Sequence, residues 1–127
     1  MRTGGCLCRR VRYRIGGGMS GTAACHCSQC RRWTGHGFAS GSVEREALAV
    51  EGEVAWYEST PGEVRRGFCP TCGSSLFWER IGAPEVDVLL GTLDAPTGER
   101  LEYHIYVADK GDYYEIGDGL PQHASRP

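Results

Sequence analysis

Seven cysteines in three tight clusters constrain this chain more than any other feature of its sequence. The clusters are Cys6 with Cys8, Cys25 with Cys27 and Cys30, and Cys69 with Cys72. Thiols two or three residues apart suit chelation of one metal ion, whereas disulfide partners usually lie farther apart along the chain. The odd count would also leave one thiol without a disulfide partner. The sequence therefore predicts metal-binding thiolates rather than a disulfide framework.

The composition indicates a small domain that needs such a metal. Leu, Ile, Val and Phe together make up 23 of the 127 residues, which is a thin supply for a hydrophobic core. The formal net charge is only −2, so the chain is not of the highly charged, disordered type. We expect one zinc-binding domain over residues 1–127, with its core between about residues 4 and 123.

Charge and hydropathy argue against two kinds of partner. The 14 Lys and Arg residues are balanced by 16 Asp and Glu residues, which argues against a general nucleic-acid binder. No apolar run approaches the roughly 20 residues that a membrane span needs. The first residues carry no apolar leader segment, and free thiolates require a reducing compartment, so we expect a cytoplasmic protein.

Short stretches with strand-like patterns, separated by turn residues, predict a mainly β fold with few helical turns. The expected strands are residues 11–15, 37–43, 54–58, 64–69, 75–79, 86–91 and 103–107. We expect short helical turns at residues 28–33, ended by Gly35, and at residues 44–48. The tail from Asp118 onward is expected to be irregular and partly loose.

The strongest local metal signal is the pair Cys69 and Cys72 with Gly73 directly after it. Two thiolates at i and i+3, followed by a tight turn, form a knuckle that supplies two of four ligands. Pairing the knuckle with Cys6 and Cys8 closes a four-thiolate zinc site and leaves the middle cluster intact. Pairing the knuckle with two cysteines of the middle cluster would instead leave three thiols unused in two separate places. A closed zinc site can contribute on the order of 10 kcal/mol of apparent folding free energy.

The middle cluster, Cys25, Cys27 and Cys30, would hold a second zinc ion with a fourth position left open. Water, an incoming ligand, His26 or His36 could take that position, and a histidine there would make the site structural. His26 could instead pack between the ligands, since both its neighbours must face the metal. Three thiolates and Zn²⁺ sum to −1, which favours a thiolate as the fourth ligand over hydroxide. We therefore expect thiol chemistry at these cysteines.

Other side chains near the clusters have less specific interpretations. Arg31 and Arg32 could bind a carboxylate of the substrate or form a solvated face. Trp33, Trp56 and Trp78 are expected to be core aromatics that cover the zinc sites. No pair of carboxylates or histidines has a spacing that identifies an acid–base catalyst.

The complete cysteine pattern resembles that of the glutathione-dependent formaldehyde-activating enzyme family, which includes proteins similar to centromere protein V. The matching motifs are C-x-C at residues 6–8, C-x-C-x-x-C at residues 25–30 and C-x-x-C-G at residues 69–73. Residues 103–107 and 114–121 also resemble the end of the family's sequences, so the resemblance covers roughly residues 4–123. Arg9 departs from the pattern, because the family usually has Gly directly after the first cysteine pair.

The resemblance implies a tent-like arrangement of β-sheets and two zinc ions. One ion would be structural, at Cys6, Cys8, Cys69 and Cys72, and the second would lie at the middle cluster. The implied reaction adds the sulfur of glutathione to formaldehyde and gives S-hydroxymethylglutathione, formally a carbon–sulfur lyase in reverse. The second zinc would carry the small thiol as a thiolate. Two other hypotheses are a non-enzymatic zinc module that binds a protein partner and a redox-sensitive zinc store.

Overall fold

The computed structural model describes all 127 residues and is mainly β, as the sequence predicts. Ten strands, one short α-helix and three 3-10 turns follow one another along the chain. The strands are β1 (Arg2–Gly5), β2 (Arg12–Ile15), β3 (Ser20–Cys25), β4 (Phe38–Glu44), β5 (Leu48–Glu51), β6 (Ala55–Thr60), β7 (Val64–Phe68), β8 (Ser75–Arg80), β9 (Glu85–Leu89) and β10 (Tyr103–Ile105). The helical segments are α1 (Ser28–Thr34), η1 (Arg45–Ala47), η2 (Leu90–Thr92) and η3 (Val107–Asp109).

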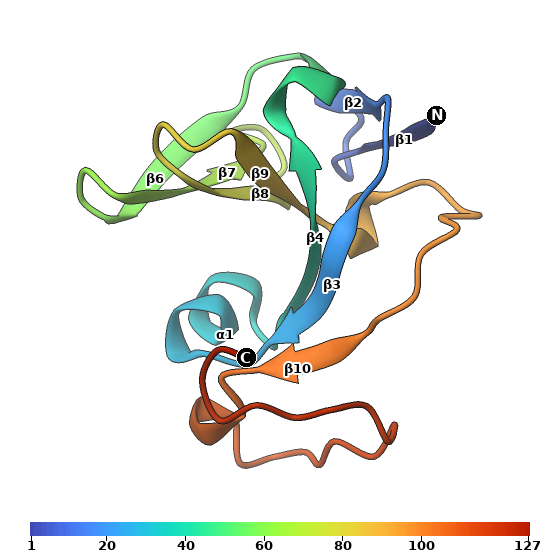
Figure 1. The fold of residues 1–127 in the computed structure, drawn as a ribbon. Helices are drawn as coiled ribbons and strands as arrows, with labels where there is room; N and C mark the ends of the chain where they lie inside the picture. Colours follow the sequence, from blue (N-terminus) through green and yellow to red (C-terminus); the bar gives the residue numbers. More distant parts are fainter.

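The strands form two sheets (Figure 1). The small sheet has the order β1-β2-β5, and the large sheet has the order β10-β3-β4-β9-β8-β7-β6. All pairs are antiparallel except β10 with β3. The only α-helix has seven residues, and no helix of the structure has the length and hydrophobicity of a membrane span.

The two faces of the large sheet have different chemistry, because side chains alternate along each strand. One face carries the main core, where Val86, Val88 and Phe77 pack with Tyr13 and Ile15 of the small sheet. The other face is more polar and carries a smaller apolar cluster beside α1. The buried members of that smaller cluster are Cys25, Cys30, Phe38 and Leu89. The polar face is therefore the one that can present chemistry to a ligand.

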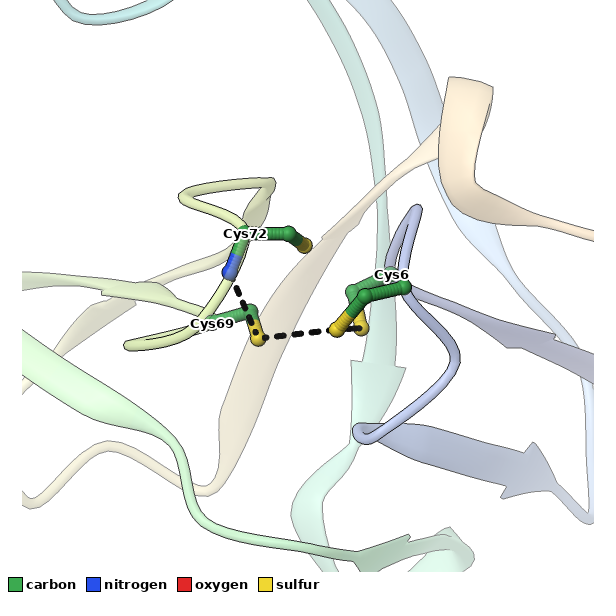
Figure 2. A group of neighbouring side chains, drawn as sticks. Cys6, Cys69 and Cys72 are labelled. Atoms are coloured by element: carbon green, nitrogen blue, oxygen red, sulfur yellow. Dashed lines mark hydrogen bonds between the residues drawn. The ribbon is translucent and has the colours of Figure 1, made fainter.

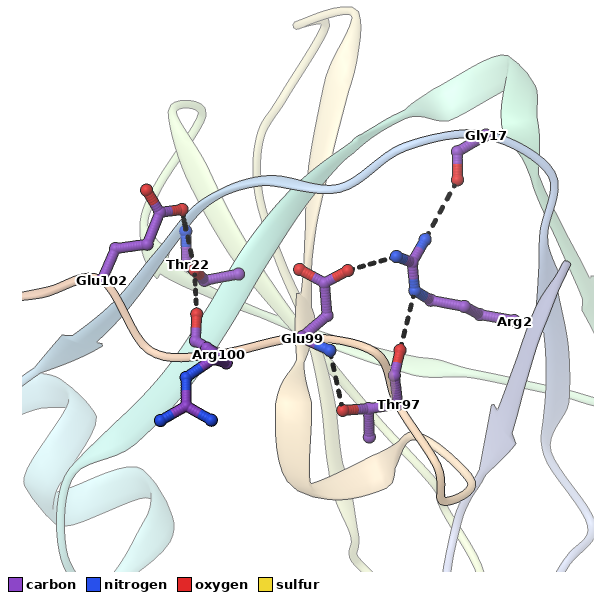
Figure 3. A network of polar contacts seen from close by, with 7 residues as sticks. All are labelled: Arg2, Gly17, Thr22, Thr97, Glu99, Arg100 and Glu102. Atoms are coloured by element: carbon purple, nitrogen blue, oxygen red, sulfur yellow. Dashed lines mark hydrogen bonds and ion pairs between the residues drawn. The ribbon is translucent and has the colours of Figure 1, made fainter.

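A long irregular segment between η2 and β10 is fastened to the strands by polar contacts (Figure 3). The Arg2 guanidinium donates to the backbone oxygen of Thr97 at 3.0 Å and pairs with the Glu99 carboxylate. The Thr22 hydroxyl donates to the Arg100 oxygen at 2.7 Å. These contacts hold the segment across the first strands and set the direction from which β10 enters the sheet.

The tail after Asp118 is attached to the sheet, so the expectation of a partly loose tail is wrong. The His104 N–H donates to the Pro121 oxygen and the His123 N–H donates back to the His104 oxygen, at 2.9 and 3.0 Å. The Tyr106 N–H donates to the Ser125 oxygen at 2.9 Å. The tail therefore satisfies the free edge of β10, and Figure 1 shows it returning toward α1.

Candidate metal centres and their cavity

Four cysteines from two distant parts of the chain meet between the sheets, and we call them the four-cysteine group: Cys6, Cys8, Cys69 and Cys72. Their sulfur atoms all lie within 4.8 Å of one another. The Sγ atoms of Cys6 and Cys8 are 3.6 Å apart, and those of Cys8 and Cys69 are 3.8 Å apart. Figure 2 shows the loop after β7 facing the loop after β1 across these sulfurs.

Backbone N–H groups of the two loops point at the sulfurs. The Thr71 and Cys72 N–H groups donate to Cys69 Sγ at 3.4 and 3.5 Å, and the Val11 N–H donates to Cys6 Sγ at 3.3 Å. The Ser74 hydroxyl lies 3.1 Å from Cys72 Sγ and lowers the pKa of that thiol to about 5. These donors favour thiolates, which is the form a metal binds.

The loop after the first cysteine pair explains the departure at Arg9. Arg9 has a left-handed φ of +71°, a conformation in which glycine has no steric penalty. A residue with a Cβ costs about 1 kcal/mol more there. Arg9 keeps the turn that a glycine would make, so the cysteine pair retains its geometry.

The remaining three cysteines form the cysteine triad: Cys25, Cys27 and Cys30. Cys25 ends β3, Cys27 is the N-cap residue of α1, and Cys30 lies in the first turn of α1. The Sγ atoms of Cys27 and Cys30 are 3.1 Å apart, and those of Cys30 and Cys25 are 3.4 Å apart. Hydrogen bonds with Cys25 and Cys30 lower the pKa of Cys27, whereas hydrogen bonds with Cys25 and Cys27 raise the pKa of Cys30.

Arg66 of β7 is a buried cation beside the triad, and sequence reasoning missed it. Its side chain is 3% exposed, and Nη1 and Nη2 lie 3.7 and 3.8 Å from Cys30 Sγ. Nη2 also donates to Gln29 Oε1 at 3.1 Å, and no carboxylate pairs with the guanidinium. A buried charge without a counter-charge is costly. The thiolates of the triad are the counter-charge that Arg66 can reach.

A cavity of about 700 Å³ opens beside the triad on the polar face of the large sheet. All three triad cysteines line it, together with Arg66 and side chains of β3, β4, β8 and β9. This volume lies in the range of small-molecule sites in proteins. The triad therefore faces a space into which a small ligand fits.

Both histidines that the sequence offered as a fourth ligand have other partners. His26 Nε2 lies 2.9 Å from His104 Nδ1, and His26 Nδ1 is hydrogen-bonded to the Tyr114 hydroxyl. His104 Nε2 in turn donates to the Asp118 carboxylate at 2.7 Å. Burial and the facing His104 ring lower the pKa of His26. This agrees with the packing interpretation of His26.

His36 is exposed and turned toward the C-terminal part of the chain. Its Nδ1 lies 2.8 Å from the Tyr113 hydroxyl. Neither His36 nor His26 is part of the triad's group of candidate ligands. No histidine therefore joins the triad, whose three cysteines line the cavity.

The tryptophans and arginines that the sequence singled out lie in different surroundings. Trp33 and Trp78 pack beside the triad, and Trp56 packs on the core that contains the four-cysteine group. Arg31 and Arg32 do not line the cavity. The arginine that reaches the triad is Arg66 of β7, and not Arg31 or Arg32, which the sequence offered for a substrate carboxylate.

The geometry of both groups fits a tetrahedral zinc ion. Zinc–sulfur bonds of about 2.3 Å place the sulfurs of a tetrahedral site roughly 3.8 Å apart. The sulfurs of the four-cysteine group already have this spacing, and those of the triad are a few tenths of an ångström closer. No cysteine forms a disulfide. Both groups can bind a metal ion, one with four ligands and one with three.

The fold and these two groups define a small β protein with two cysteine clusters that can bind metal, one of four cysteines and one of three beside a cavity. The sequence model of the glutathione-dependent formaldehyde-activating enzymes matches residues 1–109, and the chain belongs to this family.

Two individual proteins are similar to the chain. An uncharacterized lyase of Schizosaccharomyces pombe is 27% identical over 75 residues, which cover 59% of this chain and 55% of that protein. The chain thus spans about half the length of this curated relative. A crystal structure of a Rhodobacter sphaeroides protein superposes with a TM-score of 0.63 at 21% identity, over 95% of this chain and 98% of the other. At that identity the superposition supports the fold alone.

Proposed function

We propose that this protein is a zinc-dependent enzyme of the carbon–sulfur lyase type that joins a small thiol, such as glutathione, to formaldehyde. The observation that carries the proposal is the cysteine triad, whose three sulfurs converge at the wall of a ligand-sized cavity. Family membership and the lyase name of the Schizosaccharomyces pombe relative support the same chemistry.

The two cysteine groups, Arg66 and the cavity have separate roles in this reaction. The four-cysteine group would hold a structural zinc ion, and the triad would hold a second one. A zinc ion bound by the triad would act as a Lewis acid, which would keep the thiol of a substrate in its thiolate form at neutral pH. Arg66 offsets the negative charge that three protein thiolates and one substrate thiolate place in a buried site. The cavity positions the aldehyde beside the sulfur.

The chemical balance of the step is simple. The substrate sulfur forms a bond to the carbonyl carbon of formaldehyde, and the carbonyl electron pair moves to oxygen. The proton released by the thiol ends on that oxygen, so the product is the S-hydroxymethyl adduct. The reverse direction breaks the carbon–sulfur bond, which is the lyase reaction.

The proposal predicts two zinc ions per chain and a thiol ligand at the second. Protein purified without oxygen should contain two zinc ions by mass spectrometry. In cobalt-substituted protein, glutathione should change the thiolate-to-metal absorption, and the Cys27→Ser variant should lose that response. If neither glutathione nor any other small thiol perturbs the metal, the proposed function is wrong.

A further inference from the structure

Three acidic residues without an ion pair line the same cavity as the triad, namely Glu85, Asp87 and Asp109, and among them only Asp87 is half-buried. Asp87 lies on β9, between the β4 and β8 strands, and its side chain lines the cavity. The Ser42 hydroxyl donates to Asp87 Oδ1 at 2.6 Å, and the Ser40 hydroxyl donates to Oδ2 at 3.3 Å. No ion pair of the structure includes Asp87.

The unpaired state of Asp87 contrasts with the other buried carboxylate of this sheet. Glu79 of β8 is paired with both Arg45 and Arg65. Asp87 is half-buried, yet the nearest buried cation, Arg66, lies on the far side of Trp78 and is turned toward Cys30. A half-buried carboxylate that only hydroxyls hold in place has acceptor capacity left for a cation.

The distance between Asp87 and the triad sets the size of the thiol molecule that would carry this cationic group. Cys25 is opposite Phe38 on β4, and Asp87 is opposite Ser42, four residues farther along β4 and one strand farther across. At about 3.3 Å per residue and about 4.8 Å per strand, the Cα atoms of Cys25 and Asp87 are roughly 16 Å apart on a flat sheet. Side chains and metal–sulfur bonds cover part of this distance. The gap that remains favours a thiol longer than free cysteine, such as a tripeptide.

We propose that Asp87 binds the ammonium group of the thiol substrate, so that the site selects tripeptide-sized thiols with a free amino group. The inference rests on the proposed function, because it needs a thiol whose sulfur is bound at the triad. The hydroxyls of Ser40 and Ser42 hold the Asp87 carboxylate in place, and the ammonium group of the substrate donates to its remaining acceptor sites. The sulfur and the ammonium group are then held at opposite ends of one cavity, which fixes the orientation of the substrate.

The test compares glutathione with its deaminated analogue, glutaryl-cysteinyl-glycine, which differs only in the ammonium group. Dissociation constants are measured by titrating both thiols into the cobalt-substituted full chain. The wild-type protein should bind glutathione about tenfold or more tightly than the analogue, because a charge-assisted hydrogen bond is lost. In Asp87→Asn the ratio should fall to about one through weaker binding of glutathione, while the analogue binds as before.

Glu85→Gln is the matched control, since Glu85 lies two residues earlier on β9 and lines the same cavity. This variant should keep the wild-type ratio. The Ser42→Ala variant should reduce the ratio partly and provides a readout if Asp87→Asn folds poorly. A wild-type ratio of one, an unchanged ratio in Asp87→Asn, or an equal loss in Glu85→Gln would overturn the role of Asp87. Failure of both thiols to perturb the metal would instead contradict the proposed function.

Discussion

At the scale of single residues, two adjacent arginines of β7 show how strand alternation separates roles. Arg65 faces Glu79 and lies over the Trp56 ring, with 4.0 Å from the guanidinium carbon to the ring centroid. Arg66 points to the other face and reaches Cys30. The sequence signal was available, because two charged residues in a strand between Val64 and Phe68 cannot both face solvent. What it could not supply was the partner, since Cys30 lies 36 residues away in sequence.

Replacing Arg66 should weaken metal binding at the triad without unfolding the protein. Arg66→Met removes the cation but keeps much of the buried volume, and loss of such a supporting contact typically lowers metal affinity by about 10- to 100-fold. Chelator competition should show one of the two zinc ions released at correspondingly lower chelator concentration. Arg65→Met is the control, and it should leave both metal affinities unchanged. Equal zinc affinity in Arg66→Met and wild type would contradict the assigned role.

At the scale of elements, the alternation of apolar and polar residues predicted most strands. It failed for segments whose structure depends on backbone hydrogen bonds. All seven expected strands are present, with ends within two residues of those expected, and Gly35 is the C-cap of α1. β1, β3 and β5 were missed. β1 is half glycine, β3 consists mainly of small residues, and β5 is a four-residue strand on the sheet edge, so none of them has a strong pattern. The attached tail was missed because most of its hydrogen bonds to the sheet use backbone groups, which leave no mark in the sequence.

The attachment of the tail predicts a specific pattern of amide hydrogen exchange. The N–H groups of Tyr106 and His123 bond across the β10–tail contact, whereas those of Tyr113 and Glu115 have no hydrogen-bond acceptor. Exchange at Tyr106 and His123 should therefore be slower by about 100-fold or more. Measurement by nuclear magnetic resonance on the intact protein tests this. Equally fast exchange at all four amides would mean that the tail detaches in solution.

At the scale of the whole molecule, the four-cysteine group joins the two sheets. Cys6 and Cys8 follow β1 of the small sheet, and Cys69 and Cys72 lie between β7 and β8 of the large sheet. Counting thiols in the sequence already indicated this grouping, because pairing Cys69 and Cys72 with Cys6 and Cys8 leaves the three cysteines of the middle cluster together. The cavity could not be foreseen in this way, since its wall combines strands from residues 20 to 87 in an order that the pairing alone defines.

Loss of one ligand from each group should have unequal effects on stability. Cys72 and Cys27 are both partly exposed members of a C-x-x-C motif, so Cys72→Ser and Cys27→Ser are matched changes. Cys72→Ser should lower the melting temperature by more than about 10 °C, because it opens the structural site. Cys27→Ser should lower it by less than about 5 °C. Similar large losses in both would favour a non-enzymatic zinc module over the enzyme.

The order of the metal ligands along the chain bears on how the protein is made. All members of the four-cysteine group precede β9 in the sequence, yet β9 is the strand that joins β4 to β8 in the folded sheet. During synthesis, zinc can therefore close a loop of about 60 residues before the central strand has emerged from the ribosome. Metal supply during translation would then be part of the folding route of this protein.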